Sequence, residues 1–267
     1  MKDSRKYLVA FGLLVISFGY IFISNETGVA RIFVNLLTFA GIYGLAAIGI
    51  NVHFGWTGLL NFGHAAFMGI GAYTTILLIP HALGREGVVI ESGLPLPLAV
   101  IIGMIAAALL GLLLGLPTLR LRGDYLAIVT IAAAEIFRLL IRDFEDITGG
   151  VYGVIQFSDA LQNLRPNFIT NLATNIEVSS SQLWVGTITW ISIVVTLLFL
   201  NRLQKSPWGR ALRAVREDED AVRALGKNAV WLKLQSFMLG ASIGGLSGIL
   251  LAFNYGTLQA STFVPVL

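Results

Sequence analysis

The sequence has 267 residues, of which 56% are hydrophobic and only 12% are charged. A soluble domain carries about 25% charged residues, so this composition excludes an ordinary soluble enzyme and favours a chain embedded in a membrane. The absence of cysteine excludes disulfides and thiolate chemistry. The 29 glycines are typical of membrane helices that pack closely together.

Apolar stretches of spanning length recur along the whole chain. A spanning helix needs about 20 mainly apolar residues, and seven stretches meet or approach that length. In chain order they are Tyr7–Ile23, Ile32–Ile50, Gly58–Ile79, Leu94–Leu116, Tyr125–Ile141, Leu183–Leu200 and Leu234–Phe253. The sequence therefore predicts an all-α, polytopic transmembrane helical bundle, with residues 1–267 forming a single transmembrane domain.

Both ends of the sequence bear on the number of spans. Lys2, Arg5 and Lys6 precede the first apolar stretch, as in a signal peptide, but no small-residue cleavage pattern follows. We therefore interpret this stretch as a retained first span. The chain ends within another apolar stretch, Ser261–Leu267, so we expect it to be a truncated form that continues with at least one more span.

The distribution of basic residues predicts the orientation of the bundle. With a cytoplasmic N-terminus and seven alternating spans, thirteen of the 18 lysines and arginines fall in inside segments and four in outside segments. Inside segments of membrane proteins are enriched in these residues. We therefore predict a cytoplasmic N-terminus, an outer loop at residues 142–182 and a cytoplasmic loop at residues 201–233.

Two of the predicted spans carry small residues at every fourth position. They are Gly103, Ala107, Gly111 and Gly115 in one span, and Gly240, Gly244, Gly248 and Ala252 in the other. This spacing places the small residues on one helix face, where two helices can approach closely. The pattern predicts a tightly packed bundle, but channels, transporters and membrane enzymes all share it.

The span that begins at Gly58 departs from a regular helix. It and the turn before it are rich in glycine, and each glycine weakens a helix by about 1 kcal/mol relative to alanine. Asn61 and His64 are polar residues at membrane depth. We predict a discontinuous, glycine-rich span whose unwound backbone lines a cavity for substrate. The alternative is a close-packed helix in which both residues hydrogen-bond to neighbouring helices. The three histidines of the chain lack the spacing of a metal site.

One predicted span contains a pair of opposite charges. Glu135 and Arg138 lie three residues apart and therefore share a helix face. Ionisable residues inside a span are costly and are candidates for function. The alternative is a structural pair that neutralises itself near the outer end of the span.

The predicted cytoplasmic loop carries an ordered pattern of acidic, apolar and glycine residues. Its first short helix, roughly Gly209–Arg216, mixes apolar and basic residues, and its second begins with the acidic Glu217–Asp220, where a helix N-terminus favours negative charge. Gly226 can cap the second helix. Its apolar stripe consists of Ala221, Val222 and Leu225. We predict a compact helical elbow that fits a groove on a partner protein. The alternative is a solvated basic loop that only fixes topology.

Four segments resemble known permeases. Asp220–Gly226 resembles the E-A-A-x-x-x-G coupling motif of ABC importer permeases, with Asp in place of Glu and Val in place of the second Ala. Gly55–Tyr73 is similar to the glycine-rich signature of the branched-chain amino acid permeases, the LivH/LivM family. Leu121–Thr130, together with Glu135, Arg138 and Thr148–Gly150, resembles the LivM-type subunit in particular. Arg210–Glu219 resembles the stretch that leads into the coupling helix of that family. The resemblance extends from about residue 30 to the end of the chain.

The resemblance implies a permease of the cell inner membrane that works within an assembly. A homologous LivH-type permease subunit pairs with it, two cytoplasmic ABC ATPase subunits drive it, and a periplasmic binding protein delivers an amino acid. The chain has no phosphate-binding loop, so ATP is used by the partner subunits. We expect no cofactor, no bound metal, no catalytic residue and no nucleic-acid partner for this chain, which instead contacts membrane lipid.

The resemblance also assigns candidate residues to each role. ATPase docking is expected at Arg213, Arg216, Glu219, Asp220, Ala221, Val222 and Gly226. Candidates for the substrate path are Trp56, Asn61, His64, Glu135 and Arg138, and the outer loop contributes Thr148, Gly149 and Gly150.

Two alternative functions are kept. One is a urea or amide permease of the same family, and the other is a secondary transporter driven by an ion gradient. A membrane-embedded enzyme is disfavoured, because the sequence shows no nucleophile with a suitable base.

Overall fold

The computed structural model describes residues 27–79, 93–118, 123–150, 152–155 and 157–263. In these residues the long helices are α2 (Thr27–Thr57), α3 (His64–Leu78), α4 (Leu96–Thr118), α5 (Gly123–Asp143), α9 (Ser180–Lys205) and α12 (Ala229–Tyr255). Each coincides with a predicted apolar stretch, which confirms the helical class. The predicted first span, Tyr7–Ile23, lies outside the described residues, as do Arg120 and Arg122.

Shorter elements connect the long helices. They are α6 (Glu145–Thr148), β1 (Val154–Ile155), α7 (Asp159–Gln162), α8 (Asn167–Asn175), α10 (Pro207–Glu217), α11 (Glu219–Ala224), β2 (Thr257–Leu258) and the 3-10 helix η1 (Ala260–Phe263). The strands β1 and β2 pair in antiparallel register, Val154 opposite Leu258 and Ile155 opposite Thr257. This short ladder joins the loop after α5 to the end of α12.

Four helices in the described part of the chain are long and apolar enough to cross a membrane: α2, α4, α9 and α12. The apolar helix α3 is shorter, with 15 residues, and α5 interrupts its apolar sequence with Glu135 and Arg138. The structure is therefore that of a multi-pass membrane protein, while the total of seven spans stays a prediction.

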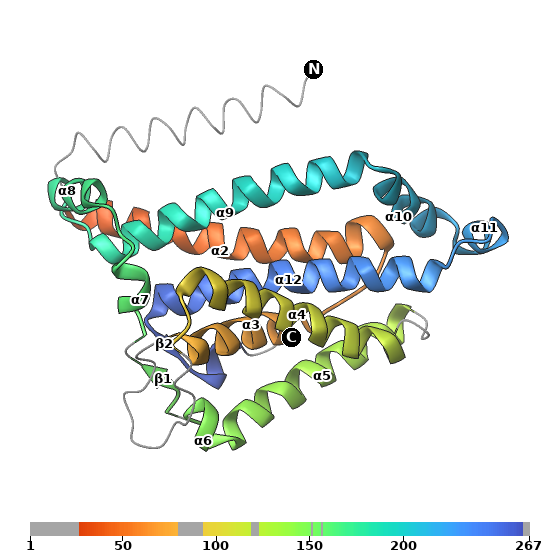
Figure 1. Cartoon of the computed structure of the whole chain (residues 1–267), viewed down its shortest axis with the longest axis horizontal. Coiled ribbons are helices and arrows are strands. Elements are labelled where there is room, and N and C mark those ends of the chain that lie inside the picture. Colours follow the sequence, from red (N-terminus) through yellow and green to blue (C-terminus); the bar gives the residue numbers. More distant parts are fainter. Residues whose placement is uncertain (1–26, 80–92, 119–122, 151, 156, 264–267) are drawn as a thin grey trace.

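The helix α12 forms the centre of the bundle and packs against α2, α3 and α4 (Figure 1). Its glycines allow this contact. A Cβ atom at Gly248 would lie 2.0 Å from the carbonyl oxygen of Met68 on α3, and one at Gly245 would lie 2.6 Å from the Cβ of Ala107 on α4. On α4, a Cβ atom at Gly103 would lie 2.2 Å from the hydroxyl of Thr75. The two predicted small-residue ridges are thus confirmed as close helix contacts.

Two hydrogen bonds fix the relative direction of α2 and α12. Ser236 and Ser247 of α12 donate hydrogen bonds, both at 2.8 Å, to the carbonyl oxygens of Val52 and Ile42 of α2, so these two helices run antiparallel. Figure 1 shows α10 and α11 at one end of the bundle, and α6, α7, α8 and the β-ladder at the other. The predicted loops at 201–233 and 142–182 therefore lie at opposite ends. Which end is cytoplasmic stays a prediction from the basic residues.

Candidate functional site

The chain breaks its helical path between α2 and α3. Helix α2 ends at Thr57, and Gly58 adopts a φ of +72°, a left-handed conformation that glycine adopts without steric cost. The Gly58 amide donates a hydrogen bond to the Phe54 carbonyl at 2.9 Å, which satisfies an acceptor of the last turn. Residues 58–63 are not helical, and α3 begins at His64. The regular helix of this predicted span therefore begins at His64 rather than at Gly58. We call residues 58–63 the α2–α3 break.

Three polar side chains are buried beside the break. Nε2 of His53 lies 2.8 Å from the carbonyl oxygen of Phe237, and a carbonyl only accepts, so this nitrogen carries the proton. Its Nδ1 therefore accepts a hydrogen bond from Nδ2 of Asn61 at 3.1 Å. The Asn61 Oδ1 in turn accepts from the Gly63 amide at 2.9 Å. His64 is also buried, and neither of its ring nitrogens has a hydrogen-bond partner in the part of the chain that the structure describes.

Glycines on α12 make room for the two imidazole rings. A Cβ atom at Gly240 would lie 2.3 Å from Nε2 of His53, and one at Gly244 would lie 2.6 Å from Nε2 of His64. The ring centroids of the histidines are 5.7 Å apart. The glycines of α12 thus accommodate the two buried histidines as well as the close approach of neighbouring helices. The sequence pattern pointed to Asn61 and His64, and the structure brings them together with His53.

The second predicted feature, the elbow, consists of α10 and α11. Helix α10 begins with Pro207, and the hydroxyl of Ser206 accepts a hydrogen bond from the Gly209 amide at 3.3 Å. Asp218 caps α11 by accepting from the Ala221 amide at 2.9 Å. Gly226, at a φ of +75°, ends α11. The two predicted helices are confirmed, although the second begins at Glu219 because Asp218 serves as its cap.

The elbow is attached to α2 and α12 by side chains. Arg216 donates a hydrogen bond from Nη1 to the carbonyl oxygen of Gly55 on α2 at 2.5 Å. Trp208 donates from Nε1 to Oε1 of Gln235 on α12 at 2.6 Å, and its ring meets Trp56 edge-on at a centroid distance of 6.1 Å. Trp56, predicted on the substrate path, is therefore a buried contact of the elbow.

A carboxylate also joins the elbow to α12. Glu219 forms ion pairs with Lys233 of α12 and with Arg223, the latter at 2.6 Å. Burial raises the pKa of the Glu219 carboxyl, but the hydrogen bond and charge of Lys233, with those of Arg223, outweigh it. The net effect is a pKa below the ordinary value of 4.5. Glu219 is thus charged at neutral pH and remains paired.

The elbow has an inner and an outer face. Val222 is 4% exposed and packs with Val215 and Ala229, whereas Leu225 is 79% exposed. The predicted single stripe of Ala221, Val222 and Leu225 is therefore wrong, because Val222 faces inward and the other two face outward. The residues of the docking prediction that are exposed and lie on or directly after α11 are Asp220, Ala221 and Gly226.

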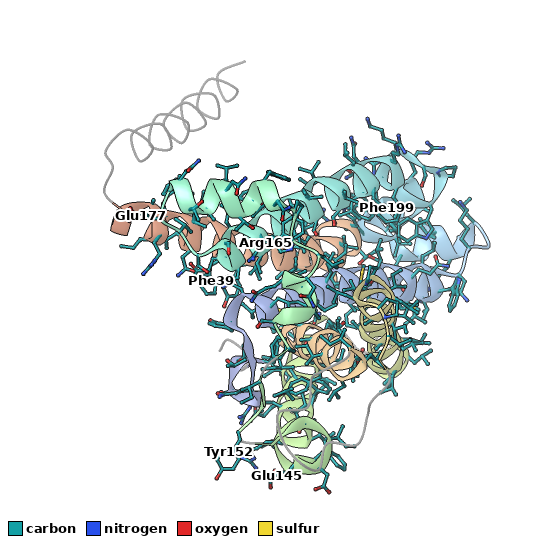
Figure 2. The ribbon with its side chains drawn as sticks, turned by 60° about the vertical axis from the view of Figure 1, so that its left-hand side comes forward. Phe39, Glu145, Tyr152, Arg165, Glu177 and Phe199 are labelled. Carbon is teal, nitrogen blue, oxygen red and sulfur yellow. The ribbon has the colours of Figure 1, made fainter. Side chains whose placement is uncertain are left out.

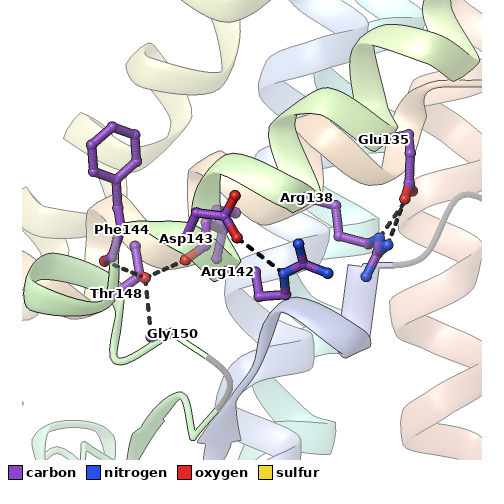
Figure 3. Close-up of polar contacts among 8 residues, drawn as sticks. Glu135, Arg138, Arg142, Asp143, Phe144, Thr148 and Gly150 are labelled. Atoms are coloured by element: carbon purple, nitrogen blue, oxygen red, sulfur yellow. Dashed lines mark hydrogen bonds and ion pairs between the residues drawn. The ribbon is translucent and has the colours of Figure 1, made fainter.

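In the described residues, the charged side chains of α5 pair with each other and not with the polar residues beside the break. Glu135 accepts two hydrogen bonds from the guanidinium of Arg138, at 2.9 and 2.5 Å. Figure 3 shows the two side chains pointing toward each other along the helix. They are 40% and 23% exposed, and they lie on a flank of α5 that the described helices leave partly uncovered. The two charges therefore neutralise each other on the surface of α5.

The predicted outer-loop residues form a turn after α5. The hydroxyl of Thr148 donates a hydrogen bond shared between the carbonyl oxygens of Ile141 and Phe144, and it accepts from the Gly150 amide at 3.3 Å (Figure 3). Gly149 has a φ of +73°. Figure 2 shows Glu145 and Tyr152 together beside this turn, both exposed. The turn redirects the chain toward β1.

Sequence reasoning missed His53, Trp208 and Gln235 as members of these sites. His53 lies on the same helix as Trp56 and eight residues before Asn61. As a polar residue in a mainly apolar stretch, it could have been predicted as a member of the site from the sequence. The partners Trp208 and Gln235 lie on different helices and 27 residues apart, so only the fold relates them.

Comparison with known proteins agrees with the resemblance. Residues 32–267 match the family described as "Branched-chain amino acid transport system / permease component". The chain is 35% identical to the high-affinity branched-chain amino acid transport system permease protein LivM of Salmonella typhimurium, over 97% of this chain and 60% of that protein. It is 36% identical to LivM of Escherichia coli over the same shares of the two chains, and 25% identical to LivH of Escherichia coli over 84% of this chain and 71% of that protein.

The extent of these matches has two consequences. The chain spans 60% of the length of the two LivM relatives. Membership of the family therefore does not by itself assign the full activity of those relatives to this chain. No solved structure matches the chain at a significant level. The family match covers both the α2–α3 break and the elbow. The chain therefore belongs to the family of permease components of branched-chain amino acid transport systems.

Proposed function

We propose that this chain is the membrane-spanning permease subunit of an ABC importer in the cell inner membrane. It moves branched-chain or other small neutral amino acids inward, and separate cytoplasmic ATPase subunits supply the energy. A LivH-type permease pairs with it, and a periplasmic binding protein delivers the amino acid. The observation that carries the proposal is the LivM kinship over 97% of the chain, together with a folded elbow whose outer face is exposed.

The outer face of the elbow is the proposed ATPase dock. Asp220, Ala221 and Gly226 are exposed there, and their helix is fixed to α12 from the other side through Glu219 and Lys233. A helix that is anchored on one face and free on the other can enter a groove of a partner without unfolding. The dock therefore consists of α11 and its glycine cap.

The α2–α3 break is the proposed element beside the substrate path. Irregular backbone at membrane depth is tolerated where it is buried in protein or lines a cavity. Asn61 and His64 lie at this break, and the imidazole nitrogens of His64 are buried and unpaired in the described residues. Glu135 and Arg138 of α5 stay secondary candidates, because a charged pair on a partly uncovered flank favours a protein or aqueous neighbour over lipid.

The dock is tested by the variant Ala221→Arg. Ala221 is exposed, so a long charged side chain there fits this chain but obstructs a partner. In vesicles that contain the whole importer, we expect uptake of radiolabelled leucine to fall at least about tenfold, the equivalent of 1.4 kcal/mol of lost coupling. Asn171→Arg, on the exposed surface of α8 at the opposite end, is the control. Unchanged uptake in Ala221→Arg would refute the dock.

The driving force and substrate are tested in the same vesicles. The proposal expects leucine, isoleucine or valine uptake that requires ATP and persists when ion gradients are collapsed. Uptake of urea in place of leucine would assign the chain to a urea or amide permease of the same family. Uptake that persists without ATP but stops with the ion gradient would show a secondary transporter and overturn the proposal.

A further inference from the structure

The contact between Arg216 and Gly55 connects the elbow to the membrane helix that leads to the break. Its two residues are 161 positions apart in the chain, and Nη1 of Arg216 lies 2.5 Å from the carbonyl oxygen of Gly55. The last carbonyls of a helix lack intrahelical partners and carry partial negative charge. A guanidinium is therefore well suited to bind the end of α2.

The same side chain lies beside the break itself. A Cβ atom at Gly58 would lie 3.7 Å from Cγ of Arg216, which places the arginine stem over the residue where α2 turns out of its helix. Trp208, also on α10, contacts Trp56 in the same last turn of α2. The elbow thus lies against positions 55, 56 and 58, at the end of α2 and the start of the break that contains Asn61.

The other arginines of α10 have different partners. Arg213 donates to the carbonyl oxygen of Gln204 at 3.2 Å, and Arg210 donates to that of Lys205 at 3.2 Å. Both acceptors belong to the end of α9, the helix that directly precedes the elbow. These contacts stabilise the local turn. Among the arginines of α10, Arg216 therefore stands out by binding a helix distant in sequence.

We propose that Arg216 is a positioning residue that transmits movement of the elbow to the α2–α3 break. This inference rests on the proposed function, because it assumes that an ATPase moves the elbow. Displacement of α10 moves the guanidinium that holds the Gly55 carbonyl, and the last turn of α2 follows it. The break then changes its geometry at Asn61, which hydrogen-bonds to both His53 and Gly63. Arg216 is thus a link within this chain, in addition to its position near the dock.

Coupling, rather than folding, is the property that depends on this contact. Arg216 is exposed, and an exposed hydrogen bond contributes little to stability. The burial of Leu212 and Val215 holds α10 in place without it. Loss of Arg216 should therefore leave the permease inserted and assembled, with an ATPase that is less effective in driving uptake.

The test measures leucine uptake and ATP hydrolysis in the same vesicles, with the whole importer present. In Arg216→Ala we expect the ratio of leucine taken up to ATP hydrolysed to fall about fivefold or more, the lower range of coupling energies between sites. Arg216→Lys keeps a cationic donor and should restore part of the ratio. Arg210→Ala removes an arginine from the same helix that is outside the predicted dock and has only a local partner, so its ratio should match the wild type.

The outcomes separate this inference from the proposed function. A wild-type ratio in Arg216→Ala, in an importer that takes up leucine with ATP, would overturn the inference and leave the proposed function standing. If Arg216→Ala fails to assemble, the same ratio of leucine uptake to ATP hydrolysis is measured for Arg216→Gln, which keeps a long polar side chain without the charge. A wild-type ratio in that variant would likewise overturn the inference. Absence of ATP-driven uptake of leucine and of urea in the wild type would instead overturn the proposed function.

Discussion

The centre of the bundle and the elbow are joined to α12 by different kinds of contact. In the centre, Gly240, Gly244 and Gly248 leave space that α2 and α3 fill, so the helices meet through backbone and buried side chains. At the elbow, Gln235 and Lys233 of α12 bind Trp208 and Glu219, beside a small apolar contact in which Ala229 of α12 meets Val215 and Val222. Close packing tolerates little displacement, whereas polar side chains can follow a moving partner. We therefore expect the centre to be more rigid than the elbow.

The largest expected effect concerns the glycine face of the centre. In Gly248→Leu, the new Cβ atom would lie 2.0 Å from the Met68 carbonyl oxygen, and a backbone atom cannot yield as a flexible side chain does. We expect a loss of at least about 3 kcal/mol, measured as a fall in the melting temperature of the detergent-solubilised protein. Gly44→Leu on α2 is the control, since a Cβ atom there meets nothing within 4 Å. Equal stability of both variants would contradict a rigid centre.

A smaller effect is expected from the polar cluster at the break. Asn61→Ala removes the donor to Nδ1 of His53 and the acceptor of the Gly63 amide, and leaves both groups buried. We expect a loss of about 1–2 kcal/mol, again from thermal unfolding. Asn171→Ala on the exposed side of α8 should cause no such loss. A melting temperature equal to that of the wild type would show that the cluster does not hold the break.

The elbow contacts should be weaker than those of the centre. Trp208→Phe keeps an aromatic ring beside Trp56 but removes the hydrogen bond to Oε1 of Gln235. We expect a loss of about 1 kcal/mol, measured by chemical unfolding. Gln235→Leu should give the same loss, and the double variant should lose little more, because both changes remove one interaction. Additive losses would show that the two side chains act separately.

The smallest effect is expected from the ion pair of the elbow. Glu219→Gln should cost about 1 kcal/mol or less at neutral pH, because the pair with Lys233 is partly exposed. The pKa of Glu219 is lowered in the folded state, so its contribution is present above the ordinary value of 4.5 and is lost as the pH falls through the lower folded value. The wild type and Glu219→Gln should therefore become equally stable in acid. A stability difference that persists below that range would contradict this assignment.

Several features could be predicted from the sequence because they depend on local pattern. Apolar length identified the long helices from α2 to α12, and glycine spacing identified the close-packed faces of α4 and α12. The acidic residues and Gly226 indicated a second elbow helix. The start of α3 was misplaced because an apolar run does not show where the backbone turns, and Gly58 determines that through its positive φ.

Long-range pairing was decided only by the tertiary structure. The family resemblance placed Arg216 in the dock, but the fold brings its guanidinium to Gly55, 161 positions away. The pattern grouped Val222 with Leu225, but packing against Val215 and Ala229 buries only Val222. By itself, the sequence determined the helical class, the glycine faces and the family, since these depend on composition, periodicity and motif. The structure decided which side chains meet, because contacts between distant segments depend on how the helices pack.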